Sequence, residues 1–225
     1  MADIFGIAPG VGFARFAGRT IILDIRADRY WQLGEAAGRV LSAVANGSIP
    51  RTGDGALDQL LALGLVVRGP ERRNRVRHGG AGPIAARGAL EESGREKEPI
   101  PAMLQIEAAA RLFSARAALK RRPLRDVLCR LAVRRARTRP RRPARDLAAL
   151  ARQFDAARRL LPFAPVCLPD SLALLHVAIW HGHAPRLVFG VEAFPFAAHC
   201  WVQQGTLVLN DALDHARRFT PIFVL

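Results

Sequence analysis

Short apolar runs separated by two-residue turns dominate the beginning of the chain. Around residues 13–33 the runs GFARFA, TIILDI and RYWQL are separated by Gly18-Arg19 and Ala27-Asp28. The runs contain β-branched and aromatic residues, and the gaps have the length of hairpin loops. The pattern therefore predicts a three-stranded antiparallel meander.

The spacing of apolar residues then changes to that of helices. Residues 35–47 carry their apolar side chains on one helical face. A second helical pattern begins after Asp54, which is a suitable N-cap, and stops at Gly64. Residues 65–67 are all apolar and predict a last short strand. Together these elements predict a small winged-helix-like module over residues 1–68.

Gly, Pro and charged residues dominate residues 69–101, so we expect this segment to be a linker. From residue 102 the pattern is helical, with three helical segments before Pro162 and a fourth that begins near Cys167. Three strand-like runs follow, and FTPIFVL adds another. Residues 102–225 are therefore predicted to form a helix-backed antiparallel sheet, and the fold class of the whole chain is α+β.

Length and composition narrow the class of protein. The chain has 225 residues, half of them apolar, which is enough for a core without disulfides or a metal. It contains no uninterrupted apolar run of about 18 residues and no secretory signal pattern, so no membrane span is predicted. Three cysteines, an odd number, fit a reducing compartment better than a disulfide framework. We therefore expect a cytoplasmic protein.

The formal net charge of +15 comes almost entirely from arginine, since Lys97 and Lys120 are the only lysines. Such an excess predicts attraction to polyanions or acidic peptides. A GC-rich genome, which favours Arg and Ala codons together, produces the same composition. Charge alone therefore does not identify a function.

Candidate chemistry lies near the C-terminus, where Cys167, His199 and Asp211 can provide a nucleophile, a base and an orienting carboxylate. Cys167 precedes an apolar helical pattern, so we expect it at a helix N-terminus, where the macrodipole stabilises a thiolate. His199 and Asp211 belong to apolar runs on either side of a turn at residues 203–205. The predicted hairpin brings them side by side. Asp214 is the alternative orienting carboxylate.

We expect structural roles for the other two cysteines and for His181 and His183. Cys129 lies on the apolar side of its predicted helix, and we expect it to be buried and inert. Cys200 follows His199, so strand alternation predicts that it points away from the triad. His181 and His183 flank a glycine without other ligands at metal-binding spacing, which favours capping of the Cys167 helix. No metal and no cofactor are predicted.

The N-terminal pattern, in which RYWQL leads into the first helix and LLALGLVV closes the module, resembles the PqqD-like peptide-recognition domain. The resemblance implies that residues 1–68 bind the leader region of a ribosomal precursor peptide. The leader would add as a strand beside the third strand and against the last helix. The residues implied in leader binding are Arg29, Tyr30, Trp31, Leu33, Leu57, Leu60 and Leu61. For the leucines, an ordinary core role is the alternative.

The C-terminal half contains C-L-x-x-S-L-A-L, F-G-V, P-F-x-A-H-x-W-V and G-x-x-x-N-D, in this order. This pattern resembles the lasso peptide biosynthesis B proteins, which are transglutaminase-like, papain-related cysteine proteases. The resemblance implies a leader peptidase that uses the triad Cys167, His199 and Asp211. It also implies a partner, an asparagine-synthetase-like lasso cyclase that uses ATP. Where such proteins often carry Arg, this chain has Asp170.

Two other functions stay open. A basic winged-helix protein without enzymatic activity would bind nucleic acid along the phosphates. The predicted helix ALDQLLALG contains no Lys or Arg, however, and prolines split the Arg-rich segment. A transamidase would keep the fold but transfer the acyl group to an amine instead of water. We therefore expect a cysteine peptidase without a nucleic-acid partner.

Overall fold

The computed structural model describes residues 4–48, 55–69, 86–90, 100–139 and 146–225. The chain forms two compact units. Unit 1 comprises residues 1–83, 191–197 and 220–224, and unit 2 comprises residues 84–190, 198–219 and 225. Two late segments thus join the N-terminal part of the chain in unit 1. The predicted division into residues 1–68, 69–101 and 102–225 stays a prediction.

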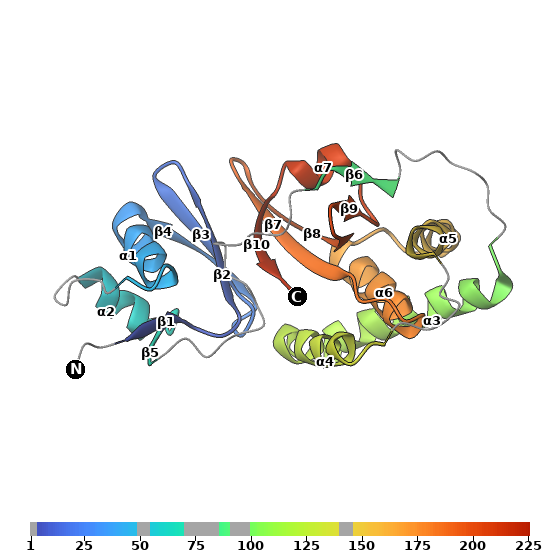
Figure 1. Cartoon of the computed structure of the whole chain (residues 1–225), viewed down its shortest axis with the longest axis horizontal. Helices are drawn as coiled ribbons and strands as arrows, with labels where there is room; N and C mark the ends of the chain where they lie inside the picture. Colours follow the sequence, from blue (N-terminus) through green and yellow to red (C-terminus); the bar gives the residue numbers. More distant parts are fainter. Residues whose placement is uncertain (1–3, 49–54, 70–85, 91–99, 140–145) are drawn as a thin grey trace. The chain divides into compact units, whose positions relative to one another are not determined.

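The sheet of unit 1 is an antiparallel meander in the order β2 (Val11–Phe16), β3 (Arg19–Asp24), β4 (Arg29–Gly34) (Figure 1). Helix α1 (Glu35–Ala45) packs on β3 and β4, and α2 (Gly55–Ala62) packs on α1. β1 (Phe5–Ile7) pairs with β5 (Val66–Arg68) in a separate antiparallel ladder. The predicted meander and helices are confirmed. β1 was not predicted because three residues are too few to show periodicity.

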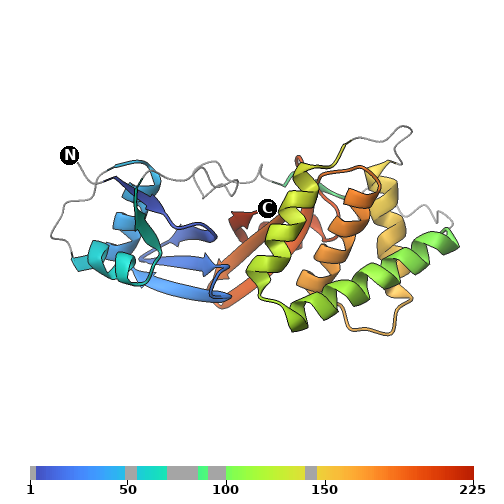
Figure 2. The same cartoon turned by 90° about the horizontal axis from the view of Figure 1, so that it is seen from below.

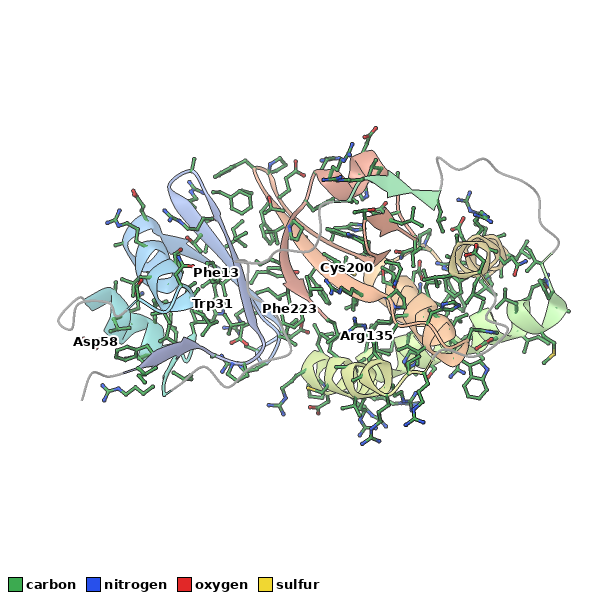
Figure 3. All side chains as sticks on the ribbon, viewed as in Figure 1. Phe13, Trp31, Asp58, Arg135, Cys200 and Phe223 are labelled. Atoms are coloured by element: carbon green, nitrogen blue, oxygen red, sulfur yellow. The ribbon has the colours of Figure 1, made fainter. Side chains whose placement is uncertain are left out.

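Apolar side chains from the sheet, α1 and α2 form one core in unit 1. Ile22, Leu41 and Leu60 are fully buried there. Phe13 belongs to the same cluster and Trp31 packs against it; both are labelled in Figure 3. Gly64 follows α2 with φ +65°, a conformation that glycine adopts without strain. The chain can therefore turn sharply from α2 into β5.

β10 (Thr220–Val224), at the C-terminal end of the chain, packs against β2 within unit 1. The contact is so close that a Cβ atom at Gly12 would collide with the backbone oxygen of Ile222. A glycine at this position of β2 is therefore required by the approach of β10.

Four helices dominate unit 2: α3 (Ala102–Arg121), α4 (Leu124–Ala136), α5 (Leu147–Arg159) and α6 (Cys167–Trp180). Figure 2 shows α6, in orange, between α4 and α5, with α3 running across them. Nearly every side of α6 is buried, as a central helix requires. The predicted helices, including the start of the last one at Cys167, are confirmed.

A five-stranded sheet has the order β10-β7-β8-β9-β6; β10 and residues 191–197 of this sheet are assigned to unit 1 and its other residues to unit 2. Its further strands are β6 (Gly88–Ala89), β7 (Arg186–Ala193), β8 (Phe196–Gln204) and β9 (Leu207–Val208). β8 and β9 form the predicted antiparallel hairpin, but β6 pairs with β9 in parallel. The prediction of an antiparallel sheet is corrected accordingly. β6 lies inside the predicted linker, and two residues whose partner comes more than a hundred positions later leave no local signal.

Cys129 on α4 is exposed, so the prediction that it is buried was wrong. It lies at the border of the apolar face of α4, next to the buried Leu128.

None of the helices among the described residues is long and apolar enough to cross a membrane. The predicted linker outside residues 69, 86–90 and 100–101 falls outside the described residues, as does Asp54.

Candidate active site

Cys167 is the first residue of α6, as its sequence context predicts. Val166 is the N-cap of the helix and has extended backbone angles. The sulfur therefore lies at the end of α6 where backbone N–H groups point outward and the macrodipole is positive. This position favours the thiolate form of Cys167.

The loop before Cys167 is held by an ion pair. Arg158 Nε donates to Asp170 Oδ1 at 3.0 Å, and its Nη2 donates to the carbonyls of Phe163 and Ala164, each at 3.0 Å. The second oxygen of Asp170 accepts the N–H of Val166 at 3.1 Å. Asp170 thus holds both the N-cap residue Val166 and Arg158, an internal role that explains an acid at this position of the Cys167 helix.

His199 and Asp211 form a short hydrogen bond, 2.7 Å from Nε2 to Oδ2. His199 lies on β8, whereas Asp211 lies in the bend between β9 and α7 (Leu213–Arg217), so the prediction that both lie on the sheet is corrected for Asp211. The N–H of Ala212 donates to Asp211 Oδ1 at 2.9 Å and fixes the carboxylate from its own backbone. The alternative, Asp214, is exposed on α7, so Asp211 is the carboxylate that contacts His199.

Hydrogen bonds to the sulfur lower the pKa of Cys167 to about 4. The largest contribution comes from the thiol of Cys200, burial opposes it, and His199 and the backbone N–H of Cys200 add to it. The proton of Cys200 is retained in return, because its hydrogen bond to Cys167 raises the pKa of Cys200 well above 9. Cys167 is therefore the thiolate of the pair and Cys200 the donor.

His199 is held as the matching cation. Burial lowers its pKa, but hydrogen bonds to Asp211 and Cys167 outweigh burial and raise the pKa of His199 to about 9. For Asp211, burial disfavours the charged form and so raises the pKa. The hydrogen bonds from His199 and His215 outweigh burial and leave the pKa of Asp211 below its ordinary value. The three groups therefore form a thiolate–imidazolium–carboxylate array, the charge state in which a cysteine nucleophile is already activated.

The contact between Cys200 and Cys167 corrects the prediction that Cys200 points away from the triad. Cys200, labelled in Figure 3, is 2% exposed and faces α6, where it also contacts Ser171. Strand alternation does send His199 and Cys200 in different directions. The beginning of α6 lies within reach of both, however, and sequence alternation says nothing about where the partner helix begins.

Two residues of the sequence pattern that had no assigned role, Ser171 and Asn210, connect the elements that carry the site. Asn210 accepts the N–H of Val202 at 2.7 Å through Oδ1 and donates to Ser171 Oγ at 2.9 Å through Nδ2. Ser171 Oγ donates to the carbonyl of Cys200 at 3.3 Å. This chain of bonds ties α6 to β8 and to the bend before Asp211, and so fixes the relative positions of the three candidate groups.

His215 is a member of the site that sequence reasoning missed. Its Nδ1 lies 2.9 and 3.0 Å from the two oxygens of Asp211. Ligand atoms of His199, Asp211 and His215 all lie within 4.8 Å of one another, so this set is close enough to hold a metal ion. The hydrogen bonds from both rings to Asp211 account for the three groups without an ion. The only signal in the sequence was the i, i+4 spacing of Asp211 and His215 on either side of a helix start.

His181 and His183 are not part of this site. His181 is the C-cap of α6, as predicted, and its Nε2 lies 3.0 Å from Glu107 Oε2 on α3.

The residues implied in leader binding divide into two groups in unit 1. Arg29, Tyr30, Trp31 and Leu33 lie on β4, which is an end strand of its sheet among the described residues. Trp31 packs against the core, whereas Tyr30 contacts the ring of Phe196, with centroids 5.5 Å apart. Leu57 and Leu60 on α2 are buried in the core, and Leu61 is partly buried against it, so the core interpretation holds for the first two.

Comparison with known proteins gives one match. Residues 109–224, just over half of the chain, match the family model of the transglutaminase-like superfamily. The matched segment contains Cys167, His199 and Asp211. Searches of curated proteins and of solved structures found no match.

Proposed function

We propose that the chain, which belongs to the transglutaminase-like superfamily of cysteine peptidases and transglutaminases, is a leader peptidase of lasso peptide biosynthesis. The superfamily supports the chemistry, and the finer role rests on the resemblance of the sequence motifs to the lasso peptide biosynthesis B proteins. The observation that carries the proposal is the array of Cys167 at the start of α6, His199 and the 2.7 Å bond from His199 to Asp211. Its reaction is hydrolysis of the peptide bond between the leader and the core of a precursor peptide.

The chemistry follows from the charges of the three groups. The Cys167 thiolate attacks the scissile carbonyl carbon, and the backbone N–H of Cys167 at the helix start is suitably placed to stabilise the oxyanion. Collapse of the tetrahedral intermediate breaks the C–N bond, and the proton on His199 passes to the leaving amine. A water molecule, deprotonated by His199, then attacks the thioester, which releases the carboxylic acid and restores the thiolate. Asp211 keeps the ring of His199 oriented throughout.

Leader recognition is proposed for β4 in unit 1. An extended peptide can add as a further strand beside an end strand of a sheet, and neighbouring side chains select its sequence. Arg29 and Tyr30 are the side chains of β4 that are best placed for this selection, since Leu33 is buried. Leu57 and Leu60 contribute indirectly, as the core that supports the sheet.

The proposed partners follow from the resemblance to the lasso peptide biosynthesis B proteins. Cleavage frees the α-amine of the core peptide, and the asparagine-synthetase-like cyclase of such systems condenses that amine with an Asp or Glu side chain. ATP is used by the cyclase, because hydrolysis of a peptide bond by a thiolate requires no cofactor.

Transamidation is the second candidate, favoured by the same superfamily membership. In that reaction an amine, instead of water, attacks the thioester of Cys167. The two reactions differ in product mass: hydrolysis adds water across the bond, whereas transamidation joins the acyl group to the added amine.

The test incubates the chain with the precursor peptide encoded beside its gene, with and without a primary amine, and reads the masses of the products. We expect a leader ending in a free carboxylate and a core beginning with a free amine, and no product with Cys167→Ala. Cleavage that persists in Cys167→Ala would contradict the assignment of the nucleophile.

Leader recognition needs a separate test, with a fluorescent leader peptide. Arg29→Glu and Tyr30→Ala on β4 should weaken binding about tenfold. Arg39→Ala, on the exposed face of α1, is the matched control and should bind normally. Equal affinity of all four proteins would contradict the proposed role of β4.

A further inference from the structure

His215 hydrogen-bonds to both carboxylate oxygens of Asp211. It lies on α7, four residues after Asp211, and its Nδ1 is 2.9 Å from Oδ1 and 3.0 Å from Oδ2. The carboxylate can only accept, so the ring nitrogen is the donor. One N–H is therefore shared between both oxygens of Asp211.

The ring of His215 also packs against the other half of the site. Its centroid is 4.6 Å from that of His199 and 5.3 Å from that of Phe219, both in edge-on arrangements. The side chain of His215 is 42% exposed, against 16% for His199 and 14% for Asp211. His215 is thus the most exposed side chain of the three, and its ring packs edge-on against that of His199.

These contacts give His215 a task that no other described residue performs. The backbone N–H of Ala212 bonds to Oδ1 of Asp211 and His199 bonds to Oδ2, whereas His215 bonds to both oxygens. His215 takes no part in the proton transfer of His199, so it anchors the carboxylate with a bond that does not change when His199 gains or loses its proton. The direction in which Oδ2 meets the ring of His199 then stays constant while the ring gains and loses its proton.

We propose that His215 is a positioning residue, whose Nδ1–H anchors both oxygens of the Asp211 carboxylate and, through them, the orientation of His199. The proposal rests on the proposed function in one respect, since the catalytic consequence is the one expected for a peptidase. The structural consequence, a weakened bond between His199 and Asp211, is independent of the substrate.

Three substitutions separate the donor from the ring. His215→Phe keeps an aromatic ring but places carbon where Nδ1 was. His215→Asn loses the ring but keeps an N–H donor on the same carbon as Nδ1. His215→Gln carries the same amide one carbon further out, so it has the right chemistry in the wrong place. Asp214→Asn, an exposed neighbour on α7, is the control.

Kinetics on the precursor peptide should distinguish positioning from binding. We expect kcat to fall about ten- to a hundredfold in His215→Phe and His215→Gln, the usual effect of losing a hydrogen bond to a charged group, with KM unchanged. His215→Asn should recover most of kcat, and Asp214→Asn should equal the wild type. Should His215→Asn be as slow as His215→Phe, the ring and not the Nδ1 donor would matter, and the proposal would be overturned.

The second readout needs no substrate. Nitrogen-15 labelling of histidine makes the Nε2–H proton of His199 visible by NMR, and a strong bond to Asp211 moves it downfield. We expect this signal in the wild type and His215→Asn, and its loss or broadening in His215→Phe and His215→Gln. An unchanged signal in the last two variants would overturn the proposal. If the wild-type chain did not cleave the precursor, the proposed function would fail while this measurement would still decide the role of His215.

Discussion

The thiol and the backbone N–H of Cys200 both lower the pKa of Cys167 by hydrogen bonding to its sulfur, and the thiol has the larger effect. Only the first can be removed by substitution. A hydrogen bond to a charged acceptor contributes about 1.5–3 kcal/mol, and one pKa unit corresponds to about 1.4 kcal/mol. Cys200→Ala should therefore raise the pKa of Cys167 by about one unit or more.

The measurement is the rate of alkylation of Cys167 by iodoacetamide as a function of pH. Because Cys129 is exposed and also reacts, the experiment belongs in a Cys129→Ser background. Cys200→Ser keeps a donor at this position and should return the midpoint towards that of the parent. Identical midpoints for the Ala variant and the parent would show that the thiol of Cys200 does not stabilise the thiolate.

The pH dependence of activity follows from two pKa values. The pKa of Cys167 is lowered from 9.0 to about 4, and the pKa of His199 is raised from 6.5 to about 9. As pH falls through about 4 the thiolate takes up a proton and the nucleophile is lost. As pH rises through about 9 the imidazolium loses the proton that the leaving amine needs. Among the described residues, Asp211 and Cys200 hydrogen-bond to this pair, and His215 packs against the ring of His199.

We therefore expect a bell-shaped plot of kcat/KM against pH, with a plateau between about 4 and about 9. The two limbs belong to the coupled pair and not to either residue alone. A thiol and an imidazole that did not interact would instead titrate at their ordinary pKa values of 9.0 and 6.5, so activity would be confined to the range between about pH 6.5 and 9.0 and would already fall below pH 6.5. That result would contradict the ion pair.

Local sequence predicted those parts of the site that depend on local structure. Cys167 begins a helix because an extended, proline-containing loop precedes it and a continuous apolar helical pattern follows. The spacing of His199 and Asp211 around a tight turn likewise brought them together, with Gly205 at φ +57° in the turn between β8 and β9. Each of these features is fixed within about a dozen residues, the range over which periodicity and turn residues are informative.

The features that were missed depend on how separate elements pack. Cys200 reaches Cys167 because α6 begins beside β8, and β6 exists because a two-residue segment meets β9. No local pattern encodes such contacts, since they are set by the registration of elements far apart in the chain.

A buried ion pair supports the loop that leads to Cys167. The side chains of Arg158 and Asp170 are 8% and 15% exposed, and Arg158 also donates to two carbonyls of the loop. Arg158→Met leaves Asp170 without its cation and the carbonyls without their donor. We expect the free energy of unfolding to fall by about 3 kcal/mol, as for other buried pairs from which one partner is removed.

Urea denaturation monitored by circular dichroism measures this loss. The matched control is Arg159→Met, because Arg159 pairs with Asp155 at the surface, where both side chains are about half exposed. The control should change the free energy of unfolding by no more than about 0.5 kcal/mol. Equal effects of the two substitutions would mean that the pair of Arg158 and Asp170 has no special role.

Gly190, in the middle of the F-G-V motif on β7, marks a place where the packing behind His199 leaves no room. A Cβ atom there would lie 2.8 Å from Cβ of Phe219 and 2.9 Å from the ring of Trp201. The rings of Phe219 and Trp201 flank His199, at centroid distances of 5.0 and 6.0 Å, respectively.

Gly190→Ala should therefore destabilise the chain by about 2 kcal/mol through overpacking, and should also lower kcat because the rings that support His199 must shift. Gly88→Ala on β6 is the control, since a Cβ atom there meets only Leu207 Cδ1, at an ordinary contact distance of 3.8 Å. Urea denaturation and cleavage kinetics measure the two effects, and a Gly190→Ala protein as stable and as active as Gly88→Ala would contradict this account of the motif.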